Sequence, residues 1–259
     1  MSCKSETITG IEVFAGGGGL ALGLEKAGVN TVAVVEFDHE ACETLRHNRP
    51  KWNVIEADIH NVDFTKYKNQ VDLVSGGAPC QAFSYAGKKL GFGDTRGTLF
   101  SEFARCVKEV NPKMFLFENV RGLLSHDNGR TFATIKHTFE DLGYAVQYKI
   151  LNACYYGVGQ KRERIIVIGI RNDMLGIISF SYPKPDETWT TLKDALKNCP
   201  KSEGQRFSEI SGKSWNWFLL EVVGLICLKL LRKNIWEKAI ILVVDAEEWQ
   251  GASHGMNHA

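Results

Sequence analysis

The sequence predicts an α/β protein built on a doubly wound, mainly parallel sheet. Short apolar, β-branched runs alternate with segments of helical composition along the first two thirds of the chain. A glycine-rich stretch separates the first of these runs from the first helical segment. Strands that alternate with helices of this length form βαβ units, which place helices on both faces of a parallel sheet.

The expected elements follow in order along the chain. An apolar run over 8–14 is broken by the glycines at 16–19, and a helical segment follows over 20–27. The next run is β-branched and ends near Glu36. The expected strands are 8–14, 31–37, 53–55, 71–75, 114–117, 145–151 and 164–170, and the expected helices are 20–27, 39–46, 99–110 and 131–142.

Composition narrows the classes of protein to consider. The 259 residues are 44% hydrophobic, which is ordinary for a soluble globular protein. A net charge of +1 gives no strong overall field, so a nucleic-acid surface would be a local patch. The seven cysteines form no C-x-x-C pair, which argues against zinc and a disulfide framework and fits a reducing cytosol. The apolar stretch over 218–231 is too short to span a bilayer.

The first expected strand leads into a loop suited to a nucleotide. Phe14-Ala15-Gly16-Gly17-Gly18-Gly19 leaves the backbone open to close approach by a ligand. Glu36 ends the second strand, where a carboxylate accepts hydrogen bonds from ribose hydroxyls, and Asp58 follows the third. Because the loop also satisfies the G-x-G-x-x-A dinucleotide pattern, a nicotinamide (NAD)-dependent oxidoreductase stays open at this point.

A cysteine follows the fourth expected strand, in Pro79-Cys80-Gln81. The carboxyl end of such a strand is where an open α/β sheet places its chemistry, and a thiol can attack carbon directly. Glu118 ends another apolar run, and alternation puts Gln160, Arg162 and Arg164 on one face of an extended segment. Hydride transfer needs no such cysteine, so these residues favour covalent catalysis.

Together these segments resemble the DNA (cytosine-5) methyltransferases of bacterial restriction–modification systems. The resemblance covers roughly residues 8–208 and implies a Rossmann-like fold that binds S-adenosylmethionine (AdoMet). The matching segments, in the family's order, are Phe14 to Gly19, Gly76-Gly77-Ala78-Pro79-Cys80-Gln81-Ala82-Phe83-Ser84, Asp94-Thr95-Arg96-Gly97-Thr98-Leu99-Phe100, Glu118-Asn119-Val120 and Gln160 to Arg164.

The resemblance also implies roles for individual residues, and no metal. Cys80 would add to C6 of cytosine, with Glu118, Arg162 and Arg164 as the other catalytic residues. The DNA-binding residues would be Gln81, Ser84, Arg96 and Gln160, and the segment 84–96 would form a lid. The residues expected to cradle AdoMet are Phe14, Ala15, Gly16, Gly18, Gly19, Glu36, Phe37, Asp58, Ile59 and Pro79.

The implied substrate is a cytosine flipped out of duplex DNA. The resemblance further implies a cognate restriction endonuclease in the same system, and a location in the bacterial cytoplasm.

The composition changes after residue 208. We expect an incomplete AdoMet-dependent catalytic domain over 1–208 and an unrelated tail over 209–259, without the target-recognition region that the family carries. Four of the six tryptophans fall in this tail. Read in a shifted frame, its codons permit strings similar to later segments of the family, so the hypothesis is an out-of-frame translation. The alternative for the tail is a genuine helical segment over 218–233. The alternative for the function is that the chain is an inactive fragment, or a fragment that needs a complementing C-terminal polypeptide.

Overall fold

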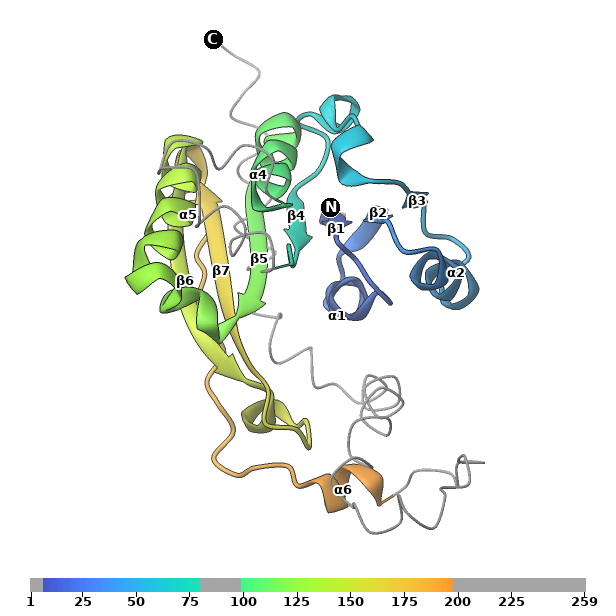
Figure 1. Cartoon of the computed structure of the whole chain (residues 1–259), viewed down its shortest axis with the longest axis vertical. Coiled ribbons are helices and arrows are strands. Elements are labelled where there is room, and N and C mark those ends of the chain that lie inside the picture. The colour runs from blue at the N-terminus through green and yellow to red at the C-terminus, as the bar shows by residue number, and fades with distance from the viewer. Residues whose placement is uncertain (1–6, 80–98, 198–259) are drawn as a thin grey trace, which may run out of the picture.

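A computed structural model gives the fold, and it describes residues 7–79 and 99–197 (Figure 1). The predictions made for Cys80, Gln81, Ser84, Arg96, the segment 84–96 and the tail over 209–259 lie outside the described residues.

The described chain forms a seven-stranded sheet in the order β3-β2-β1-β4-β5-β7-β6. The first five strands in this order run parallel, and β7 runs antiparallel to both β5 and β6. The strands are β1 (Thr9–Val13), β2 (Asn30–Glu36), β3 (Val54–Glu56), β4 (Leu73–Gly76), β5 (Met114–Val120), β6 (Tyr144–Asn152) and β7 (Glu163–Arg171). The predicted doubly wound, mainly parallel sheet is confirmed.

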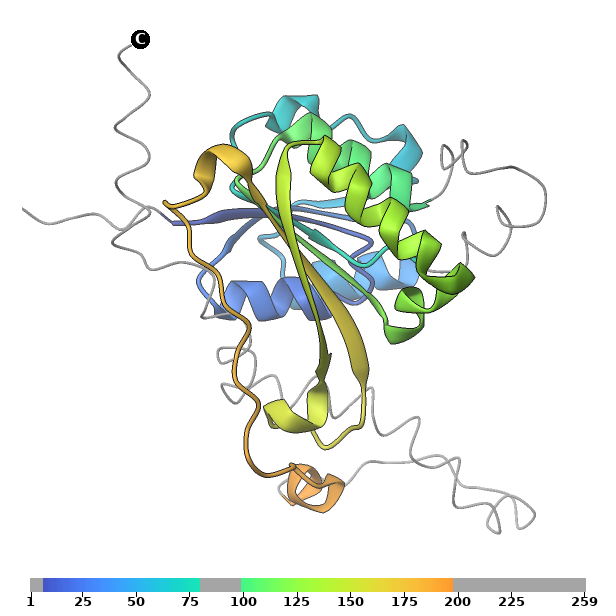
Figure 2. The same cartoon turned by 90° about the vertical axis from the view of Figure 1, so that its left-hand side faces the viewer.

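Helices cover both faces of this sheet (Figure 2). Phenylalanines of α4 (Leu99–Val110) and α5 (Arg130–Asp141) pack with Phe115 and Phe117 of β5 in the largest core cluster. On the other face lie α1 (Gly19–Lys26) and α2 (His39–Asn48), which contribute Leu24 and Leu45 to separate clusters. The short α6 (Leu192–Leu196) lies apart from the sheet, beyond the β6–β7 hairpin.

The order of the strands reverses beside β1. The chain passes from β1 to β2 on one side, and later returns from β3 to β4 on the other. Ligands of doubly wound proteins bind in the crevice at the carboxyl ends of two such strands. Gly76 makes the close approach of β1 and β4 possible, because a Cβ on it would lie 2.3 Å from the Val13 carbonyl oxygen. The loops after Val13 and Gly76 therefore leave neighbouring parallel strands at the same edge of the sheet, where proteins of this class form their crevice.

Most predicted boundaries hold to within a few residues, and β5 is the instructive exception. The apolar run predicts a strand that ends near Phe117, but β5 continues to Val120 because β7 pairs with it as far as Arg164. Glu118 and Asn119 therefore project from a paired strand, which holds their backbone in place. No helix within 7–79 and 99–197 combines the length and apolar character that crossing a membrane requires.

Candidate active site

The loop after β1 turns sharply, and one side of its backbone is not covered by other atoms. Phe14, Gly16 and Gly18 have positive φ values of 57°, 53° and 82°. Glycine suits position 18, because its φ is positive and a Cβ there would lie 2.6 Å from Leu45 Cδ2 in α2. A Cβ on Gly16, Gly17 or Gly19 would meet no atom within 4 Å, so this side of the loop offers space for a ligand. The predicted loop residues, including the buried Ala15, lie together here.

Glu36 holds this loop against the end of β2. Its Oε2 accepts a hydrogen bond from the Gly16 N–H at 2.6 Å, and its Oε1 accepts from the N–H groups of Phe37 and Asp38 at 2.8 and 2.9 Å. A carboxylate has about four acceptor positions, so one remains for a ligand hydroxyl. Phe37 beside it is 73% exposed, so its ring is open to contact by a ligand.

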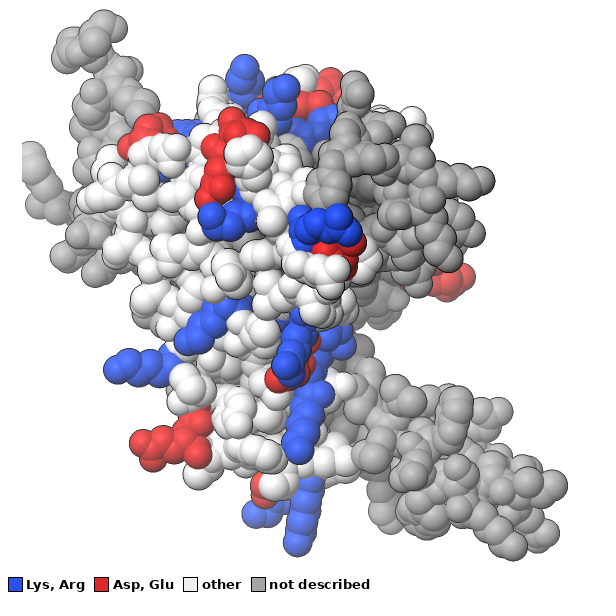
Figure 3. Space-filling view, turned by 60° about the vertical axis from the view of Figure 1, so that its left-hand side comes forward, with Lys and Arg blue, Asp and Glu red and all other residues white. Residues whose placement is uncertain are grey.

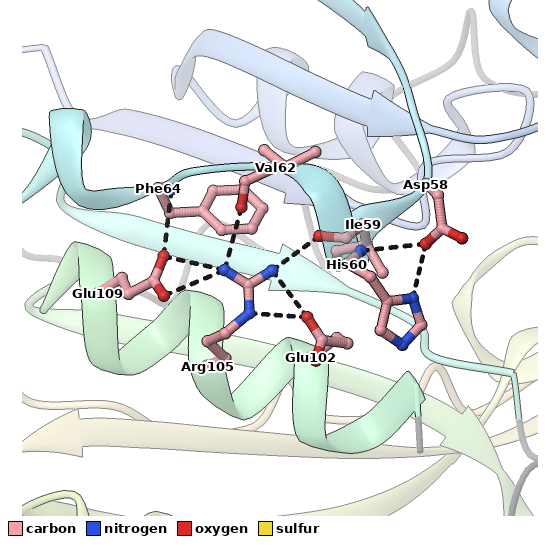
Figure 4. Close-up of polar contacts among 8 residues, drawn as sticks. All are labelled: Asp58, Ile59, His60, Val62, Phe64, Glu102, Arg105 and Glu109. Carbon is pink, nitrogen blue, oxygen red and sulfur yellow. Dashed lines mark hydrogen bonds and ion pairs between the residues drawn. The ribbon is translucent and has the colours of Figure 1, made fainter. Parts of the chain in front are cut away.

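Asp58 and Ile59 follow β3, the next strand along the sheet from β2. Asp58 caps the 3₁₀ turn at Ile59–Asn61, and its Oδ1 accepts from the His60 N–H at 3.0 Å and contacts His60 Nδ1 at 2.6 Å (Figure 4). These hydrogen bonds, the backbone one first, lower the pKa of Asp58 below its ordinary value. Ile59 is buried in the core, so it anchors the turn that presents Asp58.

A carboxylate and a guanidinium meet on the other side of the crevice. Arg164 Nε lies 2.8 Å from Glu118 Oε1, and both side chains are partly buried. The antiparallel register of β5 and β7 brings them together, since Arg164 pairs with Val120. A Cβ on Gly77 would lie 2.8 Å from Glu118 Oε2, so the segment after β4 passes directly against this carboxylate.

Asn119, for which the sequence predicted no role of its own, connects β5 to the segment after β4. Its buried side chain donates from Nδ2 to the Ala78 carbonyl at 2.9 Å, and its Oδ1 accepts from the Val120 N–H. Ala78 is buried and Pro79 is exposed, and Cys80 follows Pro79 in the sequence. Asn119 therefore fixes the backbone from which Cys80 continues.

Gln160 departs from the expected extended segment. The Gln160 N–H donates to the Val158 carbonyl at 2.7 Å, which places Gln160 in a tight turn before β7 begins at Glu163. Arg162 is exposed, and its backbone N–H donates to Asn152 Oδ1 at 3.1 Å. Only Arg164 of the three predicted residues contacts Glu118 in the described structure.

Glu12, in the middle of β1, is a second residue for which the sequence predicted no role. It is 3% exposed, and the Ser75 hydroxyl and the Ala21 backbone donate hydrogen bonds to it. Burial raises its pKa to about 8, against these hydrogen bonds, which lower it. A single acid inside an apolar strand is the sequence signal that could have drawn attention to it.

No group of three or more His, Cys, Asp or Glu side chains within the described ranges could hold a metal ion. The carboxyl edge of the sheet combines the open glycine loop, the Glu36 carboxylate and the exposed Phe37 ring. It also carries the Glu118–Arg164 ion pair. This arrangement defines a doubly wound α/β protein, a class whose ligands bind at the switch point of the sheet.

Comparison with known proteins identifies the family. The family model for C-5 cytosine-specific DNA methylases matches residues 8–217, and the chain belongs to that family. This membership favours the methyltransferase over the nicotinamide-dependent oxidoreductase that the glycine pattern left open.

Individual relatives agree with the family match. The chain is 57% identical over 212 residues to the Type II methyltransferase M.Eco47II of Escherichia coli, covering 79% of this chain and 51% of that protein. It is 53% identical over 207 residues to M.PspPI of a Psychrobacter strain, covering 77% and 50%. The chain thus spans about half the length of these curated relatives. The solved Dnmt2 methyltransferase of S. pombe shares the fold, with a TM-score of 0.61 at 17% identity over 82% of this chain and 66% of that one.

Proposed function

We propose that this chain carries the cofactor-binding and catalytic part of a DNA (cytosine-5) methyltransferase that methylates C5 of cytosine in duplex DNA. The observation that carries the proposal is the Glu118–Arg164 pair, which lies against the segment leading to Cys80. Its strand β5 is two places along the sheet from β1, the strand that leads into the glycine loop. A methyl donor and a base could be held on the two sides of the crevice.

The residues of the first side fit AdoMet. The open backbone at Gly16 and Gly17 accommodates the ligand, Glu36 retains an acceptor for a ribose hydroxyl, and the exposed Phe37 ring can stack on adenine. Asp58 offers a carboxylate to the exocyclic amine of adenine. When bound, AdoMet supplies an activated methyl group.

The residues of the second side fit a cytosine. The Cys80 thiolate would add to C6, forming a sulfur–carbon bond and making C5 nucleophilic. Glu118 would hydrogen-bond N3 and the exocyclic amine as charge develops on the ring, and Arg164 would orient Glu118. After C5 is methylated, loss of its proton and cleavage of the sulfur–carbon bond restore the aromatic ring and the free thiol. Arg162 is a candidate to contact the base or a nearby phosphate.

DNA would approach the part of the molecule formed by the β6–β7 hairpin and the segment after it. Figure 3 shows lysine and arginine side chains on this lower half of the molecule, with acidic side chains among them. The two segments contribute the exposed side chains of Lys149, Lys161, Arg162, Lys184 and Lys193. Such a local patch suits binding to phosphates by a chain whose net charge is only +1. Gln160 lies in the same hairpin, and Gln81, Ser84 and Arg96 are proposed to complete the contacts.

Two further assignments accompany this function. We propose a location in the bacterial cytoplasm and a cognate restriction endonuclease that recognises the same DNA sequence. We also propose that residues 1–208 form the catalytic domain and that 209–259 are translated out of frame. Sequencing the gene tests this division: a one-base insertion or deletion near codon 209 supports it, and an uninterrupted family reading frame across that codon would refute it.

Methyl transfer from labelled AdoMet to plasmid DNA tests the function. We expect incorporation by the wild-type chain, alone or with a complementing C-terminal polypeptide, and none by Cys80→Ser. A duplex with 5-fluorocytosine should trap a covalent complex, because fluorine at C5 blocks the loss of a proton that precedes release. Cys106→Ala is the control, since burial raises the pKa of that thiol and keeps it from acting as a nucleophile. Trapping by Cys80→Ser at the wild-type level would disprove the assignment.

A further inference from the structure

Arg105 of α4 joins that helix to the segment that carries Asp58 and Ile59 (Figure 4). Its Nη2 donates to the Ile59 carbonyl at 2.7 Å and its Nη1 to the Val62 carbonyl at 3.0 Å. These backbone groups lie 46 and 43 residues away in the sequence, so the contacts are tertiary ones. The guanidinium thus holds both ends of the turn that follows Asp58.

Two glutamates of α4 fix the guanidinium in this position. Glu102 accepts from Arg105 Nε at 2.7 Å, and Glu109 contacts Nη1 at 3.0 Å. Glu109 also accepts from the Phe64 N–H at 3.1 Å, and the guanidinium lies over the Phe64 ring. All three charged side chains are largely buried, at 28%, 13% and 23% exposure for Arg105, Glu102 and Glu109.

Only arginine can make this set of contacts. Its planar fork presents five N–H donors in fixed directions, which lets one group reach two carbonyls and two carboxylates at once. A lysine in its place has three donors on one atom and cannot span the same positions. The fixed geometry matters because the turn has no regular strand or long helix to hold it between β3 and β4.

We propose that Arg105 is the positioning residue for the adenosine side of the cofactor pocket. It holds the backbone of Ile59 and Val62 so that Asp58 stands at the rim of the crevice, where its carboxylate can meet the adenine amine. The inference rests on the proposed function, since it assigns the ligand of that same crevice. Arg105 itself contacts the turn and α4, so it acts through Asp58.

Calorimetric titration of the full chain with S-adenosylhomocysteine, and separately with adenosine, tests the inference. We expect Arg105→Met to weaken binding of both probes by the same factor, about tenfold, because the lost charge-assisted hydrogen bonds ordered the adenosine side of the pocket. The affinity of Arg105→Lys for each probe should lie between those of Arg105→Met and the wild type. Arg105→Lys also provides the test if Arg105→Met does not fold.

Arg171→Met is the matched control. Arg171 is also partly buried, and it also joins a backbone carbonyl, that of Asn111 at 2.6 Å, to a carboxylate, that of Asp173. It lies beside the start of β5, at the end of the sheet opposite the carboxyl ends of the parallel strands. We expect Arg171→Met to lower the melting temperature as Arg105→Met does, and to leave the affinities for both probes unchanged.

The outcomes separate this inference from the function on which it rests. Wild-type affinity in Arg105→Met and Arg105→Lys would overturn the role of Arg105 alone. Equal weakening by Arg171→Met would also overturn it, because the effect would then be one of general stability. A wild-type chain that binds neither probe would overturn the proposed function, and the role of Arg105 with it.

Discussion

Asn119 in β5 donates a hydrogen bond to the carbonyl of Ala78 at 2.9 Å, two residues before Cys80. The bond crosses from one parallel strand to the segment that leaves its neighbour. It links the backbone next to Glu118 to the backbone next to the proposed nucleophile. The Asn119 amide, which has no role in the proposed chemistry, therefore fixes the Ala78 backbone relative to Glu118.

Asn119→Ala should lower the rate of methyl transfer far more than it weakens cofactor binding. The substitution frees the Ala78 carbonyl, and a displacement of about 1 Å at a reacting group can cost roughly 100-fold in rate. Single-turnover rates and calorimetric affinities measure the two effects. Tyr144→Phe is the control, because it removes another buried side-chain bond to backbone, 2.8 Å to Pro112, outside the crevice. Equal rates in the two variants would contradict the positioning role.

Gly77→Ala should inactivate the protein while leaving it folded. The added methyl group would lie 2.8 Å from Glu118 Oε2, so either the carboxylate or the segment before Cys80 must move. Gly122→Ala is the matched control, since a Cβ there meets nothing within 4 Å. Methyl transfer and thermal melting of both variants test this, and an active Gly77→Ala protein would show that the close approach is not required.

Arg164→Met should reduce kcat by about 100-fold, within the range found when a group that stabilises developing charge is lost. Removing the guanidinium leaves Glu118 without the ion pair at 2.8 Å that orients it. Glu118→Gln should be at least as damaging, and the double variant should be little worse than Glu118→Gln, because the two side chains act as a unit. Additive losses would contradict this. Arg130→Met, which removes an ion pair with Asp127 on the surface, should keep full activity.

Glu12 should make the stability of the protein fall as pH rises. Burial raises its pKa in the folded state to about 8, above the ordinary value of 4.5. Between these values the unfolded chain holds fewer protons than the folded one, so the free energy of unfolding decreases with pH, by up to about 1.4 kcal/mol per unit. Urea unfolding from pH 5 to 8 measures this slope.

Glu12→Gln supplies the comparison for that slope. A neutral amide of the same shape can still accept the Ala21 hydrogen bond, but it has no proton to lose. We expect its stability curve to be flatter than that of the wild type and to lie above it near pH 8. Parallel curves for the two proteins would show that another group accounts for the pH dependence.

The sequence by itself predicted the sheet, most strand and helix boundaries, and the glycine loop with Glu36. These features depend on local patterns, such as the period of apolar residues and the freedom of glycine, which can be read within a few neighbouring positions. The order of short segments also predicted catalytic roles for Cys80, Glu118 and Arg164, which stay predictions, and Cys80 lies outside the described residues.

Only the tertiary structure decided which of these residues meet. The pairing of Arg164 with Glu118, the bond from Asn119 to Ala78 and the contact of Arg105 with Ile59 each join positions more than 40 residues apart. Such contacts depend on strand order, on the register of β5 with β7 and on how far a strand continues beyond its apolar run. No local pattern encodes them, because they arise only when segments far apart in the sequence pack against one another.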